Sequence, residues 1–66
     1  MVRVGRANEA RALNFLGIAL QGVRRFEEAI TAHQDAAVIF RETGDRHREG
    51  TVLGNLEAAQ VAQQQA

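Results

Sequence analysis

Two segments of this chain repeat each other at an offset of 40 residues, the first starting at Arg6 and the second at Arg46. The identical pairs are Arg6 and Arg46, Glu9 and Glu49, Leu13 and Leu53, Leu16 and Leu56, and Ala19 and Ala59. A period of this length is typical of stacked helical repeats, whose units bury their apolar faces against neighbouring units. Because 66 residues hold one helical pair and only the first helix of the next, we expect an interaction module with an unfinished edge.

The length of the chain predicts one small domain over residues 1–66. A domain of this size buries only about 60% of its unfolded surface, and its core rarely supplies more than about 3–5 kcal/mol. The chain has no cysteine for a disulfide, and the spacing of His33 and His47 fits no pattern of metal ligands. We therefore expect no metal and no cofactor, which leaves association with another chain as the remaining source of stability.

Positive and negative side chains balance, because eight arginines face eight acidic residues and there is no lysine. This balance argues against nucleic acid as the partner, since nucleic acid usually requires a basic surplus on one face. The longest apolar run, from Ala12 to Leu20, is far shorter than the roughly 20 residues that cross a bilayer. The charged amino terminus does not resemble a secretory signal. We expect a cytoplasmic protein without membrane contact.

Apolar residues at three- and four-residue spacings predict an all-α fold of three antiparallel helices, at about residues 6–21, 26–43 and 46–63. We expect Gly22 and Gly44 to end the first two helices, because glycine adopts the left-handed conformation at little cost. Asp45 is a suitable N-cap for the third helix. The predicted shared core consists of Leu13, Leu16, Gly17, Leu20, Phe26, Ala29, Ile30 and Leu53.

The first two helices carry a recognisable motif, Leu13-x2-Leu16-Gly17-x2-Leu20 followed by Ala29-x3-His33 and Ala36. This motif resembles the tetratricopeptide repeat, in the longer form of about 40 residues found in kinesin-light-chain-like arrays and bacterial regulators. The resemblance implies that the first two helices approach closely at Gly17 and Ala29. The chain departs from the family pattern through leucines at the aromatic positions, Glu57 at a small-residue position and Arg41 where short repeats place proline. The alternative is an unrelated three-helix bundle.

The resemblance also implies a peptide-binding surface on the concave side of the helices. Mapped onto this chain, that surface consists of Arg11, Asn14, Phe15, Ile18 and Gln21 on the first helix, and Thr51, Gly54, Asn55 and Ala58 on the third. In the family, asparagines on this surface hold the backbone of extended peptides. The alternative is that Asn14 and Asn55 satisfy backbone or neighbouring side chains. The paired basic residues that clamp a peptide carboxylate in chaperone-binding members are absent.

The sequence offers few side chains that could take part in catalysis or bind a metal ion. His33 lies on the apolar face of the second helix, where we expect a packed, hydrogen-bonded histidine, and His47 lies in a charged segment where we expect solvent exposure. The sequence contains no candidate nucleophile beside a base, no phosphate-binding glycine loop and no metal cluster. We therefore do not expect an enzyme.

Two functions fit these observations. The first is a scaffold that self-associates, preferably as a two-fold dimer, with exchange of helices at the glycine-containing turns as a variant. In a monomer, two apolar helix sides would be exposed to water, and these are the predicted contact surfaces. Their residues are Phe15, Ile18 and Ala19 on the first helix, and Val52, Leu56 and Ala59 on the third. The second is a peptide-binding adaptor that uses the concave surface. In both cases the expected partner is a protein or peptide.

Overall fold

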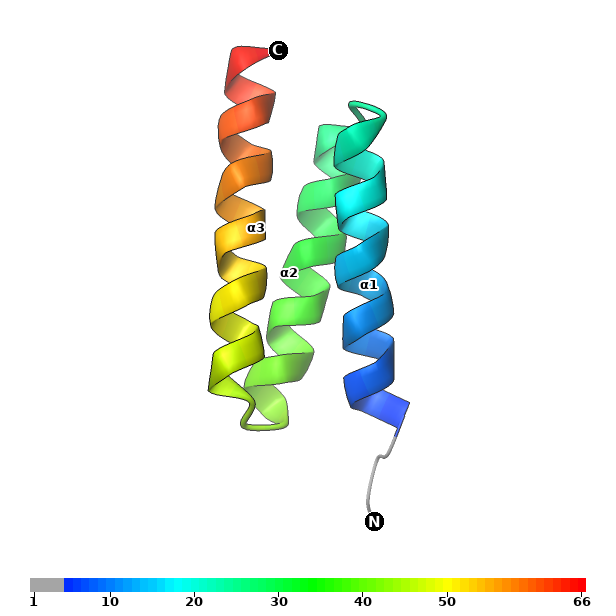
Figure 1. The fold of residues 1–66 in the computed structure, drawn as a ribbon, viewed down its shortest axis with the longest axis vertical. Coiled ribbons are helices and arrows are strands. Elements are labelled where there is room, and N and C mark those ends of the chain that lie inside the picture. Colours follow the sequence, from blue (N-terminus) through cyan, green and yellow to red (C-terminus); the bar gives the residue numbers. More distant parts are fainter. Residues whose placement is uncertain (1–4) are drawn as a thin grey trace.

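The computed structural model describes residues 5–66, and the first four residues of the predicted domain lie outside the described residues. Three helices run antiparallel along the chain: α1 (Gly5–Gly22), α2 (Phe26–Glu42) and α3 (Arg46–Gln65) (Figure 1). No strand occurs among residues 5–66. The prediction of an all-α fold, a helical hairpin followed by a third helix, is confirmed. The helix bounds differ from the predicted ones by one or two residues at four of the six ends.

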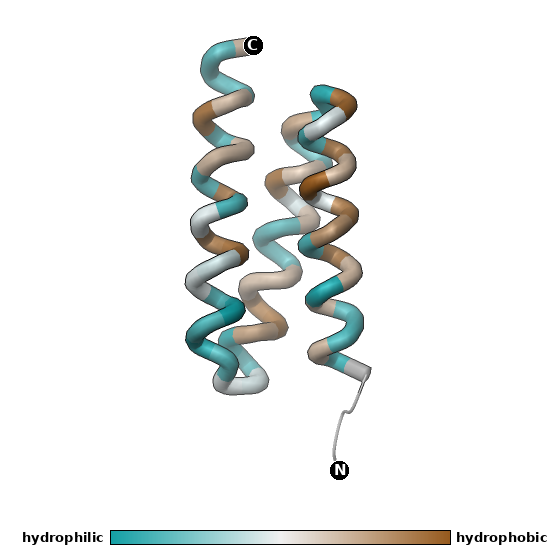
Figure 2. Tube along the Cα trace, viewed as in Figure 1, coloured by the Kyte–Doolittle hydropathy of each residue, from teal (hydrophilic) through white to brown (hydrophobic). Residues whose placement is uncertain are grey.

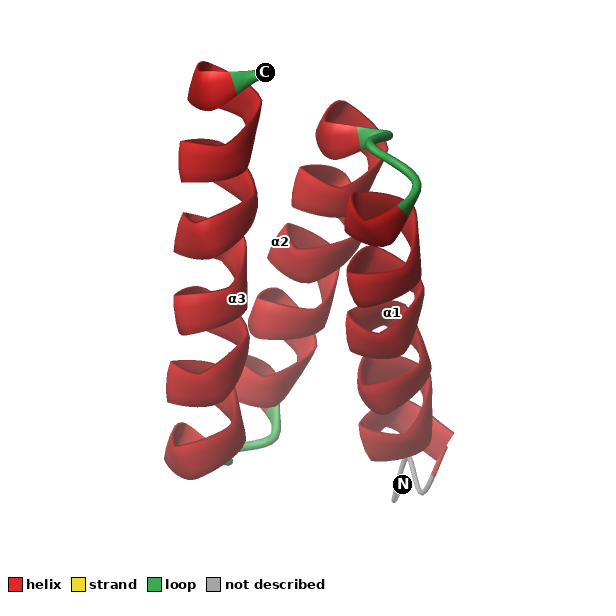
Figure 3. Ribbon diagram, turned by 45° about the horizontal axis from the view of Figure 1, so that its top comes forward, coloured by secondary structure: helices red, strands yellow, loops and turns green. Residues whose placement is uncertain are grey.

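Helix α2 is the structural centre of the molecule. It packs along both α1 and α3, whereas α1 and α3 barely contact each other (Figures 1 and 3). A closed three-helix bundle would instead pack each helix against both others. Most of the buried residues accordingly lie on α2. The main cluster contains Ala10, Ala36, Ala37, Ile39, Phe40 and Val52, with Leu13 packed against it.

The predicted core is only partly correct. Gly17 and Ala29 are buried, and Leu13, Leu20, Phe26 and Ile30 are half-buried. Leu16 and Leu53 are 49% and 39% exposed, so their assignment to the core is wrong. Leu16 lies at the open edge of the contact between α1 and α2, where it lines a surface groove together with α2 residues. Hydrophobic residues gather in the C-terminal half of α1 (Figure 2). Because they include the consecutive pair Phe15 and Leu16 and the run from Ile18 to Leu20, the sequence pattern does not distinguish the side that α2 covers.

The side of α3 that we expected to be unpaired is covered by the rest of the chain. Val52 and Ala59 are 1% and 0% exposed, and Leu56 is half-buried. These residues belong to the contact between α3 and α2, which is closest near the turn that joins the two helices (Figure 3). The prediction of a free apolar face at these three positions is therefore wrong. The matching prediction for α1 is correct, because Phe15 and Ile18 are 64% and 48% exposed and Ala19 is also exposed.

Both turns use the same backbone geometry, but only one contains the predicted left-handed glycine. After α2, Gly44 has φ +78°, and the N–H of Asp45 donates to the carbonyl of Phe40 at 2.9 Å. After α1, the left-handed residue is Arg24, with φ +66°, and not Gly22, which remains helical. The N–H of Arg25 donates to the carbonyl of Leu20 at 2.8 Å. Each turn thus closes with the six-residue hydrogen bond of a Schellman motif.

We expect Gly44→Ala to lower the free energy of unfolding by about 1–2 kcal/mol, because an L side chain is strained in the left-handed region. Gly22→Ala is the matched control. Gly22 is helical and a Cβ there meets nothing within 4 Å, so alanine should be neutral or stabilising by up to about 1 kcal/mol. Urea denaturation of the two variants measures the difference. Equal stabilities would show that the Gly44 conformation imposes no constraint.

Gly17 makes room for the ring of His33. A Cβ built on Gly17 would lie 2.6 Å from Cε1 and 2.7 Å from Nε2 of His33. The predicted close approach of α1 and α2 at Gly17 is thus observed, and the group that fills the space is the imidazole. His33 itself is 0% exposed.

Candidate functional site

A groove between α1 and α3, which we call the inner groove, has a volume of about 440 Å³. Helix α2 contributes to its floor because α1 and α3 both pack on α2 and not on each other. The residues that line the groove are Arg11, Asn14, Phe15, Phe40, Asp45, His47, Arg48, Thr51 and Val52. The groove therefore collects side chains from all three helices and from the second turn.

The floor of the inner groove is apolar and its rim is polar. Phe40 and Val52 are 2% and 1% exposed and form part of the hydrophobic core. Phe15 stands at the edge with 64% of its surface exposed. Arg11 on α1 and Arg48 on α3 lie on opposite walls of the groove. An apolar floor with a few converging polar groups is the usual composition of a binding site.

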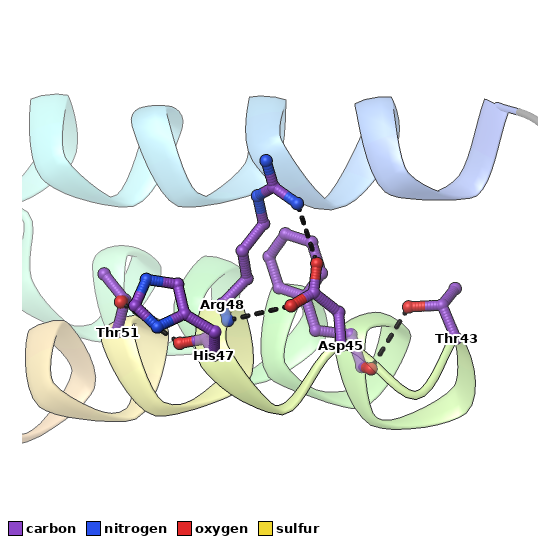
Figure 4. Close-up of polar contacts among 6 residues, drawn as sticks. Thr43, Asp45, His47, Arg48 and Thr51 are labelled. Carbon is purple, nitrogen blue, oxygen red and sulfur yellow. Dashed lines mark hydrogen bonds and ion pairs between the residues drawn. The ribbon is translucent and has the colours of Figure 1, made fainter.

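Asp45 lies at the start of α3, at one end of the inner groove, and binds Arg48 there (Figure 4). Its Oδ1 accepts the backbone N–H of Arg48 at 3.0 Å, which confirms Asp45 as the N-cap of α3. Its Oδ2 accepts Nη1 of Arg48 at 2.8 Å. These hydrogen bonds from the Arg48 backbone and then from its side chain lower the pKa of Asp45. The guanidinium of Arg48 extends toward α1 (Figure 4).

His47 and Thr51 lie beside Arg48 on the same wall (Figure 4). The hydroxyl of Thr51 donates to the backbone carbonyl of His47 at 3.2 Å. His47 is exposed, as predicted. The imidazole provides a hydrogen-bonding group for a ligand in the groove, and the Thr51 oxygen, whose proton is engaged, can still accept a hydrogen bond.

Asn14 and Asn55 bond to each other. Nδ2 of Asn55 donates to Oδ1 of Asn14 at 3.2 Å, and both side chains are half-buried. This contact joins α1 to α3 where the two helices otherwise barely touch. Of the two roles considered for these asparagines, the structure shows the one in which they satisfy neighbouring side chains.

Four residues of the predicted concave surface line the inner groove: Arg11, Asn14, Phe15 and Thr51. The predicted positions Ile18, Gln21, Gly54, Asn55 and Ala58 do not line it. The other five lining residues were not predicted to belong to this surface: Phe40, Asp45, His47, Arg48 and Val52. One signal was available for Arg48, because residues 48, 51 and 55 are spaced three and four apart and so share one face of a helix.

A second groove, which we call the outer groove, lies between α1 and α2 and has a volume of about 390 Å³. Leu13, Leu16 and Leu20 form its α1 side. Its α2 side consists of Glu27, Glu28, Thr31, Ala32 and Asp35. The outer groove is thus strongly apolar on one side and acidic on the other.

His33 is the one buried polar side chain among residues 6–66. Neither Nδ1 nor Nε2 has a hydrogen-bond partner among the described residues, so the predicted packing is correct and the predicted hydrogen bonding is wrong. Burial lowers the pKa of His33 below its ordinary value of 6.5, because a charged ring loses solvation inside the protein. Its surroundings are those of a packing residue.

Within residues 5–66 no group of three or more histidine, cysteine or carboxylate side chains is placed to hold a metal ion. None of α1, α2 and α3 combines the length and the hydropathy needed to pass through a bilayer.

No protein-family model, no curated protein and no solved structure matches this chain. The resemblance to tetratricopeptide repeats therefore stays a prediction that depends on the sequence motif.

Proposed function

We propose that this chain is a non-enzymatic protein-interaction module that holds an extended, acidic peptide in the inner groove. The observation that supports the proposal best is the combination of an apolar floor at Phe40 and Val52 with cationic side chains on both walls, Arg11 and Arg48. An extended peptide has unpaired backbone groups, and the rim offers His47 and Thr51 in addition. We also propose the tetratricopeptide-like classification and the cytoplasmic location predicted from the sequence.

The charge around the groove favours a carboxylate on the peptide. Arg11 forms no ion pair among the described residues. One nitrogen of Arg48 is engaged by Asp45, and a guanidinium has five N–H donors in all. Asp45 offsets one of the two positive charges, so the groove suits one or two acidic residues and not a densely charged polyanion. Nucleic acid is accordingly not the partner that we propose.

The proposal predicts that acidic peptides perturb the groove residues selectively. The probe is a pool of labelled peptides of about eight residues, each with two glutamates and one phenylalanine, in extended sequences. Titration followed by two-dimensional NMR should shift the amide signals of Arg11, Arg48 and Thr51. Replacing both Arg11 and Arg48 by glutamine should weaken binding at least about tenfold, since each charge-assisted hydrogen bond contributes about 1.5–3 kcal/mol.

Arg46→Gln is the matched control, because Arg46 lies two residues from Arg48 and does not line the inner groove. This variant should bind the peptides as the parent does. If Arg46→Gln lost as much peptide affinity as the double variant, the effect would be one of net charge and not of the groove. NMR signal shifts outside the groove would also contradict the proposal.

Self-association is the second candidate function, supported by the exposure of Phe15 and Ile18 at 64% and 48%. The burial of Val52 and Ala59 and the partial burial of Leu56 remove the α3 half of the surface that we first assigned to self-association. A dimer would therefore use α1 in place of both helices. Sedimentation of the parent protein at high micromolar concentration separates the two candidates, because a monomer that binds peptide excludes self-association as the function.

A further inference from the structure

The outer groove is a second apolar surface, separate from the inner groove. Its three leucines stand one turn apart on α1, and Leu16 is 49% exposed. An apolar groove of this kind on a small domain marks an interaction site. The groove lies between α1 and α2, whereas the inner groove lies between α1 and α3.

The polar groups of the outer groove exclude an extended peptide as its occupant. The hydroxyl of Thr31 already donates to the carbonyl of Glu27 at 3.1 Å. The remaining polar side chains are carboxylates, which accept hydrogen bonds but do not donate them. An extended peptide would leave backbone carbonyls without donors here, and burying such groups is costly. A helix satisfies its own backbone, so a helix is the conformation that fits.

The acidic side of the outer groove indicates which charge its partner should carry. Glu27, Glu28 and Asp35 line its α2 side. Glu28 pairs with Arg25 at 2.6 Å, whereas Glu27 and Asp35 form no ion pair among residues 5–66. A two-fold second copy would bring two such acidic sides into one interface, where like charges repel. A partner with positive charges beside its apolar stripe meets no such repulsion.

We propose that the outer groove binds a cationic amphipathic helix of a partner protein. Its apolar side chains pack between Leu13, Leu16 and Leu20, and its lysines or arginines face Glu27 and Asp35. The leucines span eight residues of α1, about two helical turns. The contact region of the partner helix therefore covers about two to three turns.

A pair of synthetic helical peptides tests this proposal. Both contain about 18 residues and carry leucines at three- and four-residue spacings; the first has lysines beside the stripe and the second has glutamates. Fluorescence anisotropy should show that the lysine peptide binds at least tenfold more tightly than the glutamate peptide. Its affinity should fall as the salt concentration rises from about 0.05 to 0.5 M, because salt screens exposed charges.

Substitutions inside and outside the outer groove test whether the peptide binds there. Leu16→Glu should lower the affinity for the lysine peptide at least tenfold. Val38→Glu should leave this affinity unchanged, because Val38 is as exposed as Leu16, at 49%, but does not line the groove. Circular dichroism verifies that both variants fold. The double variant E27Q/D35N leaves the apolar side intact and should reduce the preference for lysine over glutamate. It tests the charge argument even if Leu16→Glu does not fold.

Three outcomes would overturn the proposal. Equal binding of the two peptides would show that charge does not select the partner. Equal effects of Leu16→Glu and Val38→Glu would place the peptide elsewhere. A parent dimer that Leu16→Glu converts to a monomer, without peptide binding by the parent, would make a second copy the occupant. All three leave peptide binding in the inner groove untouched, since neither Leu16 nor Val38 lines that groove.

Discussion

Replacing Gly17 by leucine is expected to leave most of the protein unfolded at room temperature. A Cβ at this position would lie 2.6–2.8 Å from three atoms of the His33 ring, closer than real side-chain contacts. The ring is 0% exposed, so a shift of the ring would also disturb its neighbours in the protein interior. Overpacking of this kind costs about 3 kcal/mol or more when the added group is large. A domain of this size has only about 3–5 kcal/mol in total.

Gly54→Leu is the matched control, because Gly54 is also helical and a Cβ there meets nothing within 4 Å. That variant should be as stable as the parent or slightly more so, since leucine favours helix over glycine by up to about 1 kcal/mol. Denaturant unfolding compares the two. A double-mutant cycle with Gly17→Ala and His33→Ala assigns the cause. If the cost of Gly17→Ala does not shrink in the His33→Ala background, the imidazole is not the group that excludes a side chain.

Acidification below neutral pH is expected to destabilise the protein through His33. Burial holds the pKa of His33 in the folded state below the ordinary value of 6.5, so the unfolded chain binds the proton more readily. Stability is then fully present above about pH 6.5 and declines as the pH falls toward the lower pKa of the folded state. The decline is at most about 1.4 kcal/mol for each pH unit in this window.

His33→Leu should abolish this pH dependence between about pH 7.5 and 5. It should also raise the stability at pH 7.5 by about 1–2 kcal/mol, because it removes two buried nitrogen atoms without partners. His47→Gln provides the comparison, since it removes the exposed histidine at the start of α3 and keeps His33 in place. Urea midpoints measured across the pH series give the result. A pH dependence that persists in His33→Leu would assign the titration to another group.

The helices were predictable from the sequence because their boundaries depend on local chemistry. Asp45 caps α3, and Gly44 takes the left-handed conformation that the turn requires. The turn after α1 was mispredicted because Arg24 adopts the left-handed conformation in which glycine was expected. Its side chain lies over the ring of Phe26, 5.6 Å from the centroid, a contact that favours this turn. The positions of the glycines in the sequence do not reveal such a contact between side chains.

The candidate sites were less predictable, because they depend on which helices touch. The apolar stripe containing Val52 and Ala59 is a helix-packing stripe and not a free face, and the sequence shows only that it is apolar. The inner groove needed the position of α3 relative to α1 before Arg11 and Arg48 could be placed on opposite walls. The partners of Gly17 and His33 likewise became visible only with the packing of α1 on α2.

The central position of α2 has a consequence for how sequence changes combine. Because α1 and α3 barely contact each other, substitutions on the outer sides of these two helices share few neighbours, and their effects on stability should add. Substitutions in α2 act on both contacts at once and are more tightly constrained. The leucines of the outer groove and the α3 wall of the inner groove should therefore tolerate substitution independently of each other, while the alanine-rich surface of α2 should tolerate few changes.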